Sequence, residues 1–425
     1  MGDFAGYRCS LCGKQYAPDE VTYTCAVDGG NLDVILDFDA IRRQVQPGGI
    51  EGSDDLSIWR YLPLLPVADP GHMGTALRAV GWTPLLHPPR LARKAGVERL
   101  WLKDDGRNPT ASFKDRASAV VVARAQQIGA ETVVTASTGN AGAALAGMAA
   151  AAGQPAVILA PKTAPPAKVA QLLMFGARVF LVEGTYDQAF DLTLEAAREF
   201  GWYCRNTGYN PFTAEGKKSV AFEICEQFTR AQTGGADPKR RQWDAPEAIF
   251  VSVGDGNIIS GLHKGLKDLL ELGWIEHMPR LFGVQSTGSA AVYNAFVRGV
   301  EMIEPVSATT MADSISVDLP RDGVRAVRAA RETHGAYLAV EDEAILAAMR
   351  DLAREAAVFA EPAGATAYAG LVQAQQQRLL SPEWRVLVLN TGNGLKDVRA
   401  AMQASGQAAL ITPTLEALRK AVASG

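Results

Sequence analysis

The segment Asn108–Arg116 places a lysine where amine chemistry is favoured. Lys114 is predicted to start an Ala- and Val-rich helix, and its neighbours Ser112 and Asp115 are both residues that favour helix starts. The positive end of a helix dipole disfavours the protonated form of a lysine at that position. A neutral lysine amine can condense with an aldehyde to form a Schiff base. The segment alone is also compatible with a solvated surface lysine.

Two further segments are rich in small residues and predict anion-binding turns. In Thr135–Gly142 (TASTGNAG), Gly139 allows a tight turn onto a helix whose amide groups could bind a carboxylate, and Asn140 projects from that turn. The segment Val253–Gly261 (VGDGNIISG) suits a phosphate monoester, because a Gly-rich turn exposes successive N–H groups. Asp255 would repel that phosphate unless its side chain points away. A capping turn or an ordinary Gly-rich turn without a ligand remains the alternative for each segment.

The fourth segment, Asn390–Lys396 (NTGNGLK), places the hydroxyl of Thr391 directly after a predicted strand. Taken alone it is typical of an ordinary turn. Together the four segments supply a reactive amine, a carboxylate-binding turn, a phosphate-binding turn and a hydroxyl. These are the parts required to hold pyridoxal phosphate with an amino acid bound to it.

The elements that must position these segments are predicted by alternating patterns. Short runs rich in β-branched residues predict strands at Arg99–Leu102, Thr132–Thr135, Ala156–Leu159, Arg178–Val182, Ala248–Val251, Leu281–Val284 and Arg385–Leu389. Helical spacing lies between most of them, as in Gln188–Phe200 and Glu341–Ala356. The alternation predicts an α/β fold with mostly parallel sheets, whose ligands bind in loops at the carboxyl ends of strands. Residues 229–243 are predicted to form an exposed loop.

Composition limits the class of protein. A chain of 425 residues predicts at least two lobes. Lysine and arginine total 42 while aspartate and glutamate total 46, and this net charge of −4 argues against a nucleic-acid partner. Five cysteines favour a reducing, cytoplasmic location over a disulfide framework. The apolar stretch Ala141–Ala160 contains Gly153 and Pro155, and a buried helix followed by a strand explains it better than a membrane span.

The sequence resembles the threonine synthase family within the fold-type II (tryptophan synthase β-like) pyridoxal phosphate enzymes. The resemblance extends from Cys9 to about Val398 and is carried by NPTASFKDR, STGNAG, NPFTAEGKKSVAFEI, GDGNIISG, GVQSTGSAAVYNAF, VFAEPAGATAYAGL and LNTGNGLKD. It implies two lobes with mostly parallel, twisted sheets. Residues 108–216 would form the smaller lobe, and residues 35–107 and 217–425 the larger one. A homodimer is expected by analogy alone.

The resemblance also implies roles for individual residues. Lys114 would form the Schiff base and later move protons, Asn140 would bind the phenolic oxygen of the cofactor, and Thr391 would meet the pyridine nitrogen. The cofactor phosphate would be held by Gly254, Asp255, Gly256, Asn257 and Ile258, and the substrate by Ser112, Ser137, Thr138, Gly139 and Lys217. The implied reaction is loss of the γ-phosphate from O-phosphohomoserine and addition of water at the β-carbon, which yields L-threonine.

Several positions depart from the family pattern. Thr213 stands where many threonine synthases have an arginine near the substrate phosphate, Ala141 replaces a hydroxyl, and Asp255 replaces an asparagine. Lys217 could compensate, or it could be a solvated first-turn lysine. The segment Glu361–Ala365 (EPAGA) is nearer to serine/threonine dehydratases. A dehydratase or β-replacing synthase with another substrate is therefore the alternative, and a non-catalytic protein of the same fold is a third.

Residues 1–34 have a separate character. Cys9 and Cys12, followed by Cys25 and Asp28, have the spacing of a zinc ribbon, and longer threonine synthases carry one. The last ligand would be a carboxylate instead of a thiolate, which is uncommon in structural zinc sites. Either the four residues bind zinc, or the module keeps its turns without metal.

Overall fold

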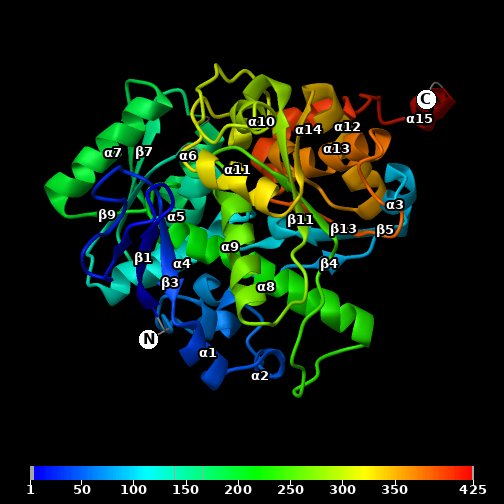
Figure 1. Ribbon diagram of the computed structural model, residues 1–425. Coiled ribbons are helices and arrows are strands. Elements are labelled where there is room, and N and C mark those ends of the chain that lie inside the picture. The colour runs from blue at the N-terminus through cyan, green and yellow to red at the C-terminus, as the bar shows by residue number, and fades with distance from the viewer. Residues whose placement is uncertain (1–3, 138, 165, 424–425) are drawn as a thin grey trace.

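The computed structural model describes residues 4–137, 139–164 and 166–423 (Figure 1). Its main element is a six-stranded sheet in the order β12-β11-β10-β13-β5-β4, in which every pair is parallel except β4 with β5. The strands are β4 (Leu85–Leu86), β5 (Arg99–Asp104), β10 (Ala248–Ser252), β11 (Arg280–Ser286), β12 (Ala336–Val340) and β13 (Arg385–Asn390). The strands β10 and β13 are almost entirely buried, as expected for a sheet that is covered on both faces.

A second sheet has four parallel strands in the order β8-β7-β6-β9. They are β6 (Val133–Ala136), β7 (Ala156–Pro161), β8 (Arg178–Val182) and β9 (Tyr203–Cys204). Every strand predicted from the sequence is present in one of these two sheets, so the α/β prediction is confirmed.

Helices cover the two sheets and fill the space between them (Figure 1). The α-helices are α1 (Phe38–Gln44), α2 (Pro47–Glu51), α3 (Pro89–Ala95), α4 (Lys114–Gln127), α5 (Asn140–Ala151), α6 (Pro166–Met174), α7 (Tyr186–Phe200), α8 (Phe212–Thr233), α9 (Asn257–Glu271), α10 (Ala291–Val297), α11 (Gly323–Glu332), α12 (Asp342–Ala356), α13 (Pro362–Gln376), α14 (Val398–Ser405) and α15 (Leu415–Ala423). Short 3₁₀ turns lie at Ile58–Leu64, Ala76–Ala79, Asp105–Arg107, Thr287–Ser289, Asp313–Ile315 and Gly394–Asp397. Helix α8 packs against both α4 and α9 and so connects the two sheets.

Two predictions about the chain outside the sheets can be judged here. The prediction of an exposed loop at 229–243 is wrong at both ends. Helix α8 continues to Thr233, and Trp243 is buried, with its indole N–H donating to Glu51. The apolar stretch Ala141–Ala160 forms most of α5 and β7, as predicted. Across the described ranges, every helix is too short or too polar to cross a bilayer.

The N-terminal residues form a small antiparallel sheet in the order β2-β1-β3. Its strands are β1 (Phe4–Cys9), β2 (Gln15–Tyr16) and β3 (Leu32–Leu36). The module packs on the main body, where the Tyr23 hydroxyl accepts a hydrogen bond from the Cys204 backbone N–H at 2.9 Å. The ring of Tyr23 stacks on that of Tyr209 with 4.5 Å between ring centroids.

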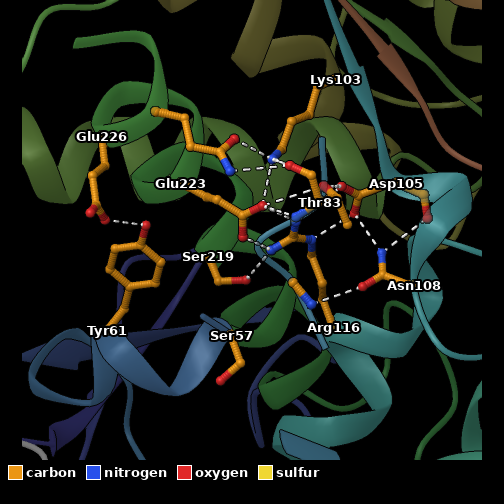
Figure 2. Close-up of polar contacts among 12 residues, drawn as sticks. Ser57, Tyr61, Thr83, Lys103, Asp105, Asn108, Arg116, Ser219, Glu223 and Glu226 are labelled. Carbon is orange, nitrogen blue, oxygen red and sulfur yellow. Dashed lines mark hydrogen bonds and ion pairs between the residues drawn. The ribbon is translucent and has the colours of Figure 1, made fainter. Parts of the chain in front are cut away.

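A buried network of charges ties the first turn of α4 to its surroundings (Figure 2). Arg116 forms ion pairs with Asp105 at 2.6 Å and with Glu223 of α8 at 2.8 Å, and Lys103 of β5 also contacts Glu223. These side chains are fully buried, and their two positive and two negative charges balance. Because Arg116 lies two residues after Lys114, the network holds that lysine relative to β5 and α8.

Replacing Arg116 by methionine should destabilise the protein strongly, because two buried carboxylates lose a shared partner. Breaking a buried pair from one side costs about 3–5 kcal/mol. The measurement is the urea or thermal unfolding midpoint of Arg116→Met. The control is Arg42→Met, which removes an exposed pair with Glu271 and should change stability by at most about 1 kcal/mol. Equal effects of the two substitutions would contradict the assigned role of the network.

Candidate active site

The segments predicted from the sequence meet around one cavity of about 210 Å³. It lies where the carboxyl ends of β6, β10 and β13 approach the start of α4. Of the predicted site residues, those that line the cavity are Lys114, Ser137, Gly139, Asn140, Lys217, Gly254, Asp255, Gly256, Asn257, Ile258 and Thr391. Thr138 lies outside the described residues. Ser112 is buried in a bridge with Gly392 and is not part of the wall, so any effect it has on the cavity is indirect.

Lys114 begins α4 with its amine at the cavity. The amine makes no hydrogen bond or ion pair with any residue that the structure describes. Burial lowers the pKa of Lys114, and the nearby Arg205 lowers it further, while Glu361 and Asp255 act in the opposite direction. The neutral amine needed for Schiff-base formation is thereby favoured.

The turn before α9 leaves no room for side chains at its two glycines. Gly256 has φ +91°, and a Cβ there would lie 2.7 Å from the Asp322 carbonyl oxygen. A Cβ on Gly254 would lie 2.9 Å from the Ile315 Cα. The turn therefore presents its backbone N–H groups and the positive end of α9 to the cavity, an arrangement that binds phosphate.

Asp255 within this turn is directed toward a backbone N–H group. Its carboxylate accepts a hydrogen bond from the Arg321 backbone N–H at 3.3 Å. Burial raises the pKa of Asp255, which favours the neutral form. Both features reduce the repulsion that an acidic residue would otherwise exert on a phosphate.

Lys217 is fully buried in the cavity wall, so the interpretation as a solvated lysine is wrong. Its Nζ donates to Asn257 Oδ1 at 2.6 Å, and Asn257 Nδ2 donates to Asp322 at 2.6 Å. Burial lowers the pKa of Lys217 well below its usual range, and the charges of Arg205 and Lys114 lower it further. The lysine has a neutral amide as its partner, so a bound anion would stabilise its charge.

The start of α5 and the loop after β13 also line the cavity, through Asn140 and Thr391. Asn140 Nδ2 donates to Glu361 Oε1 at 2.7 Å, at the start of α13. The Glu361 backbone N–H donates to the Gly392 carbonyl, and the Phe113 backbone N–H donates to the Thr391 carbonyl at 2.9 Å. These bonds connect the segments that carry Lys114, Asn140 and Thr391 into one unit.

Sequence analysis did not identify several residues at the cavity, among them Tyr186 of α7, the segment 313–317, and Arg205 and Thr207. Thr207 lines the wall, and Arg205 lies fully buried behind it. They follow β9, a strand of two residues that is too short to produce a detectable periodicity. No pattern in the sequence indicated that this loop reaches the site.

The N-terminal module brings the four predicted metal ligands together. One ligand atom from each of Cys9, Cys12, Cys25 and Asp28 lies within 4.8 Å of all the others. The Sγ atoms of Cys12 and Cys25 are 3.7 Å apart, and Cys9 Sγ lies 3.3 Å from Asp28 Oδ1. Three thiols and a carboxylate at these separations are compatible with tetrahedral zinc.

Comparison with known proteins agrees with the geometry of the cavity. A family model described as pyridoxal-phosphate dependent enzyme matches residues 76–392. The threonine synthase of Methanocaldococcus jannaschii is 35% identical over 97% of this chain and 98% of its own length. That of Methanosarcina acetivorans is 35% identical over 98% of both chains. The chain belongs to the pyridoxal-phosphate dependent enzymes, within the threonine synthase family.

Solved structures of other enzymes share the fold. The processed form of threonine deaminase isoform 2 from Solanum lycopersicum superposes with a TM-score of 0.64 at 21% identity, over 85% of this chain and 96% of its own. O-ureido-L-serine synthase also gives a TM-score of 0.64, at 18% identity, over 82% of this chain and 99% of its own. At these identities the likeness concerns the architecture and not the substrate.

Replacing Lys114 by alanine should abolish covalent attachment of the cofactor. The wild-type protein loaded with pyridoxal phosphate should show Schiff-base absorbance, and borohydride should fix the cofactor on the peptide that contains Lys114. Lys114→Ala should show neither signal, whereas Lys94→Ala, which alters an exposed lysine of α3, should behave like the wild type. A Schiff-base band that persists in Lys114→Ala would show that the wrong lysine has been assigned.

Proposed function

We propose that this protein is a pyridoxal-phosphate dependent lyase that converts O-phosphohomoserine and water into L-threonine and phosphate. The observation that carries the proposal is the identity of 35% with threonine synthases over nearly the whole chain. The cavity supports it, because every described cofactor residue that the family resemblance implies lines its wall.

The residues at the cavity fit pyridoxal phosphate. The amine of Lys114 has no partner among the described side chains, the turn at Gly254–Asn257 lines the cavity with no room for a Cβ at its two glycines, and Thr391 offers a buried hydroxyl. Lys114 would hold the aldehyde carbon, the turn would hold the phosphate, and Thr391 would meet the pyridine nitrogen. The bound cofactor supplies an electron sink for negative charge at substrate carbons.

The chain itself would orient the substrate and move its protons. Ser137 and Gly139, with Thr138 by family resemblance, would bind the substrate carboxylate at the start of α5. Lys114 Nζ, whose pKa is lowered by burial, would accept a proton from a substrate carbon and return it at a neighbouring carbon. Lys217 would supply positive charge to an anionic group in the cavity. A hydroxyl partner for the pyridine nitrogen moderates the electron sink, which favours elimination and replacement over transamination.

The alternative of a dehydratase or a β-replacing synthase rests on the departures at Thr213, Ala141 and Asp255 and on the EPAGA segment at Glu361–Ala365. Thr213, where many relatives are expected to have an arginine, does not line the cavity, and its hydroxyl donates to the Asn210 carbonyl at 2.7 Å. Ala141 lines the wall without offering a hydrogen bond. Both changes remove polar groups that could hold a substrate phosphate. A non-catalytic role is disfavoured, because Lys114 has the setting that a reactive amine requires.

Purified protein loaded with cofactor should release one inorganic phosphate for each L-threonine formed from O-phosphohomoserine. A coupled phosphate assay with product analysis measures both compounds. L-serine and L-threonine should yield little 2-oxo acid under the same conditions. Formation of 2-oxo acid from these amino acids without phosphate release from O-phosphohomoserine would establish the dehydratase alternative.

The N-terminal module is proposed to hold one structural zinc ion through Cys9, Cys12, Cys25 and Asp28. The support is the proximity of the four ligand atoms in a module whose buried apolar side chains are continuous with the main hydrophobic core. A metal bound there would fix the turns that carry the ligands, because metal binding and folding are coupled in small modules.

Removal of the metal should therefore lower stability. Elemental analysis of the wild type is expected to give one zinc per chain, and Cys12→Ser is expected to lose most of it and to melt at a lower temperature. Cys225→Ala, in the buried part of α8, serves as the control and should keep its zinc. Wild-type protein that is free of metal and insensitive to chelators would contradict the site.

Three further proposals concern the lobes, the assembly and the location of the protein. Residues 108–216 are taken as the smaller lobe, residues 35–107 and 217–425 as the larger one, and residues 1–34 as the zinc module. A homodimer is proposed by analogy with the fold class. A cytoplasmic location is proposed because all five cysteines are free.

A further inference from the structure

Arg205 carries a buried positive charge that no carboxylate balances. The residue is fully buried, and within the described part of the chain it forms no ion pair. Its Nε donates to Ser118 Oγ at 3.2 Å and its Nη1 donates to Thr207 Oγ1 at 2.6 Å, while its Nη2 has no partner. A buried guanidinium without a counter-ion is costly, so a ligand that brings negative charge would stabilise this arrangement.

The surroundings of Arg205 add to the surplus of positive charge. Arg205 lowers the pKa of both Lys217 and Lys114, which line the neighbouring cavity wall. Among carboxyl groups, Asp255 has the largest effect on the pKa of Arg205, and burial raises the pKa of Asp255 itself. The charges of this region therefore favour an anion in the adjoining part of the cavity.

Thr207 provides the contact between Arg205 and the cavity. Its hydroxyl oxygen accepts from Arg205, so its own proton is free to be donated to a group in the cavity that Thr207 lines. The loop is held in place by Asn206, whose Oδ1 accepts from the Ala136 backbone N–H at 2.8 Å and from Thr135 Oγ1 at 3.0 Å. Thr207 is thus held beside the end of β6 and polarised by a buried cation.

Thr207 and the proposed carboxylate-binding turn follow neighbouring strands of the same sheet. Strand β9, which precedes Arg205, is paired with β6, which leads into the proposed carboxylate-binding turn at Ser137–Asn140. Neighbouring strands lie about 4.8 Å apart. A four-carbon amino acid whose carboxylate lies after β6 can therefore place a γ-phosphate one strand away, beside Thr207.

We propose that Thr207, with Arg205 as its positioning residue, forms the subsite for the phosphate group of the substrate. The pair would replace the arginine that many threonine synthases have at the position of Thr213. This inference rests on the proposed function. The ligand chemistry is a phosphate monoester, which both substrate and cofactor contain. The substrate is the favoured source, because the cofactor phosphate has its own turn at the start of α9 on the other sheet.

The test compares four variants of the cofactor-loaded enzyme. Thr207→Val removes the hydroxyl, Thr207→Ser retains it, and Arg205→Gln removes the charge behind it. Thr193→Val is the matched control, since Thr193 is a buried threonine of α7 whose hydroxyl donates to the Ala189 carbonyl. For each variant the measurements are the KM for O-phosphohomoserine, inhibition by inorganic phosphate, the affinity for L-threonine as a ligand without phosphate, and the affinity for the cofactor.

Thr207→Val and Arg205→Gln should raise the KM for O-phosphohomoserine and the inhibition constant of inorganic phosphate roughly tenfold to a hundredfold, the range expected for a lost charge-assisted hydrogen bond. Affinities for L-threonine and for the cofactor should stay near wild type, and Thr207→Ser and Thr193→Val should resemble the wild type throughout.

Each contrary result has a separate meaning. An active wild type whose Thr207→Val variant keeps its KM and its phosphate inhibition refutes the subsite and leaves the proposed function intact. Weakened cofactor binding in both variants, with unchanged phosphate inhibition, also refutes the subsite and assigns the pair to the cofactor phosphate. A wild type that releases no phosphate from O-phosphohomoserine refutes the proposed function, and with it the assignment of this subsite to the substrate.

Discussion

Uncompensated positive charge at a buried site is the constraint on which the proposed chemistry of this protein depends. Lys114, Lys217 and Arg205 surround one side of the cavity, and within the described residues none of them has a carboxylate at ion-pair distance. Burying the protonated forms of these side chains is unfavourable in the free protein, and burial therefore lowers the pKa of each. A cofactor phosphate and an anionic substrate would supply the missing negative charges. Their binding would therefore offset the unfavourable burial of positive charge in the free protein.

The network around Arg116 shows the contrasting use of buried charge. Its arginine and lysine are matched by Asp105 and Glu223 at hydrogen-bonding distance, and it presents no free group to the cavity. The balanced charges hold the start of α4 in one position. Lys114, two residues before Arg116, has no such partner within the described residues, and its amine stays available to react. The two sets lie in the same region of the core and differ in whether their partners belong to the protein.

The small N-terminal module is connected to the site through the loop that follows β9. Asn31 donates to the Gly208 carbonyl, and Tyr23 accepts from the Cys204 N–H, so both contacts flank the segment that carries Arg205 and Thr207. The module therefore packs on the outside of a loop whose inner face lines the cavity. Through these contacts, the module that carries Cys25 and Asp28 supports the loop of Arg205 and Thr207, whether or not a metal is bound.

The sequence by itself determined the strand and helix alternation and most of the site, because Gly-rich turns, a lysine at a helix start and a hydroxyl after a strand are local patterns. The tertiary structure decided the rest. Lys217 has the same local sequence whether it is solvated or buried, and packing against α9 places it in the cavity wall. Arg205 and Thr207 follow a strand too short to be recognised, and long-range pairing with β6 brings them to the site. Charge balance depends on which side chains meet in space, and sequence spacing does not encode that.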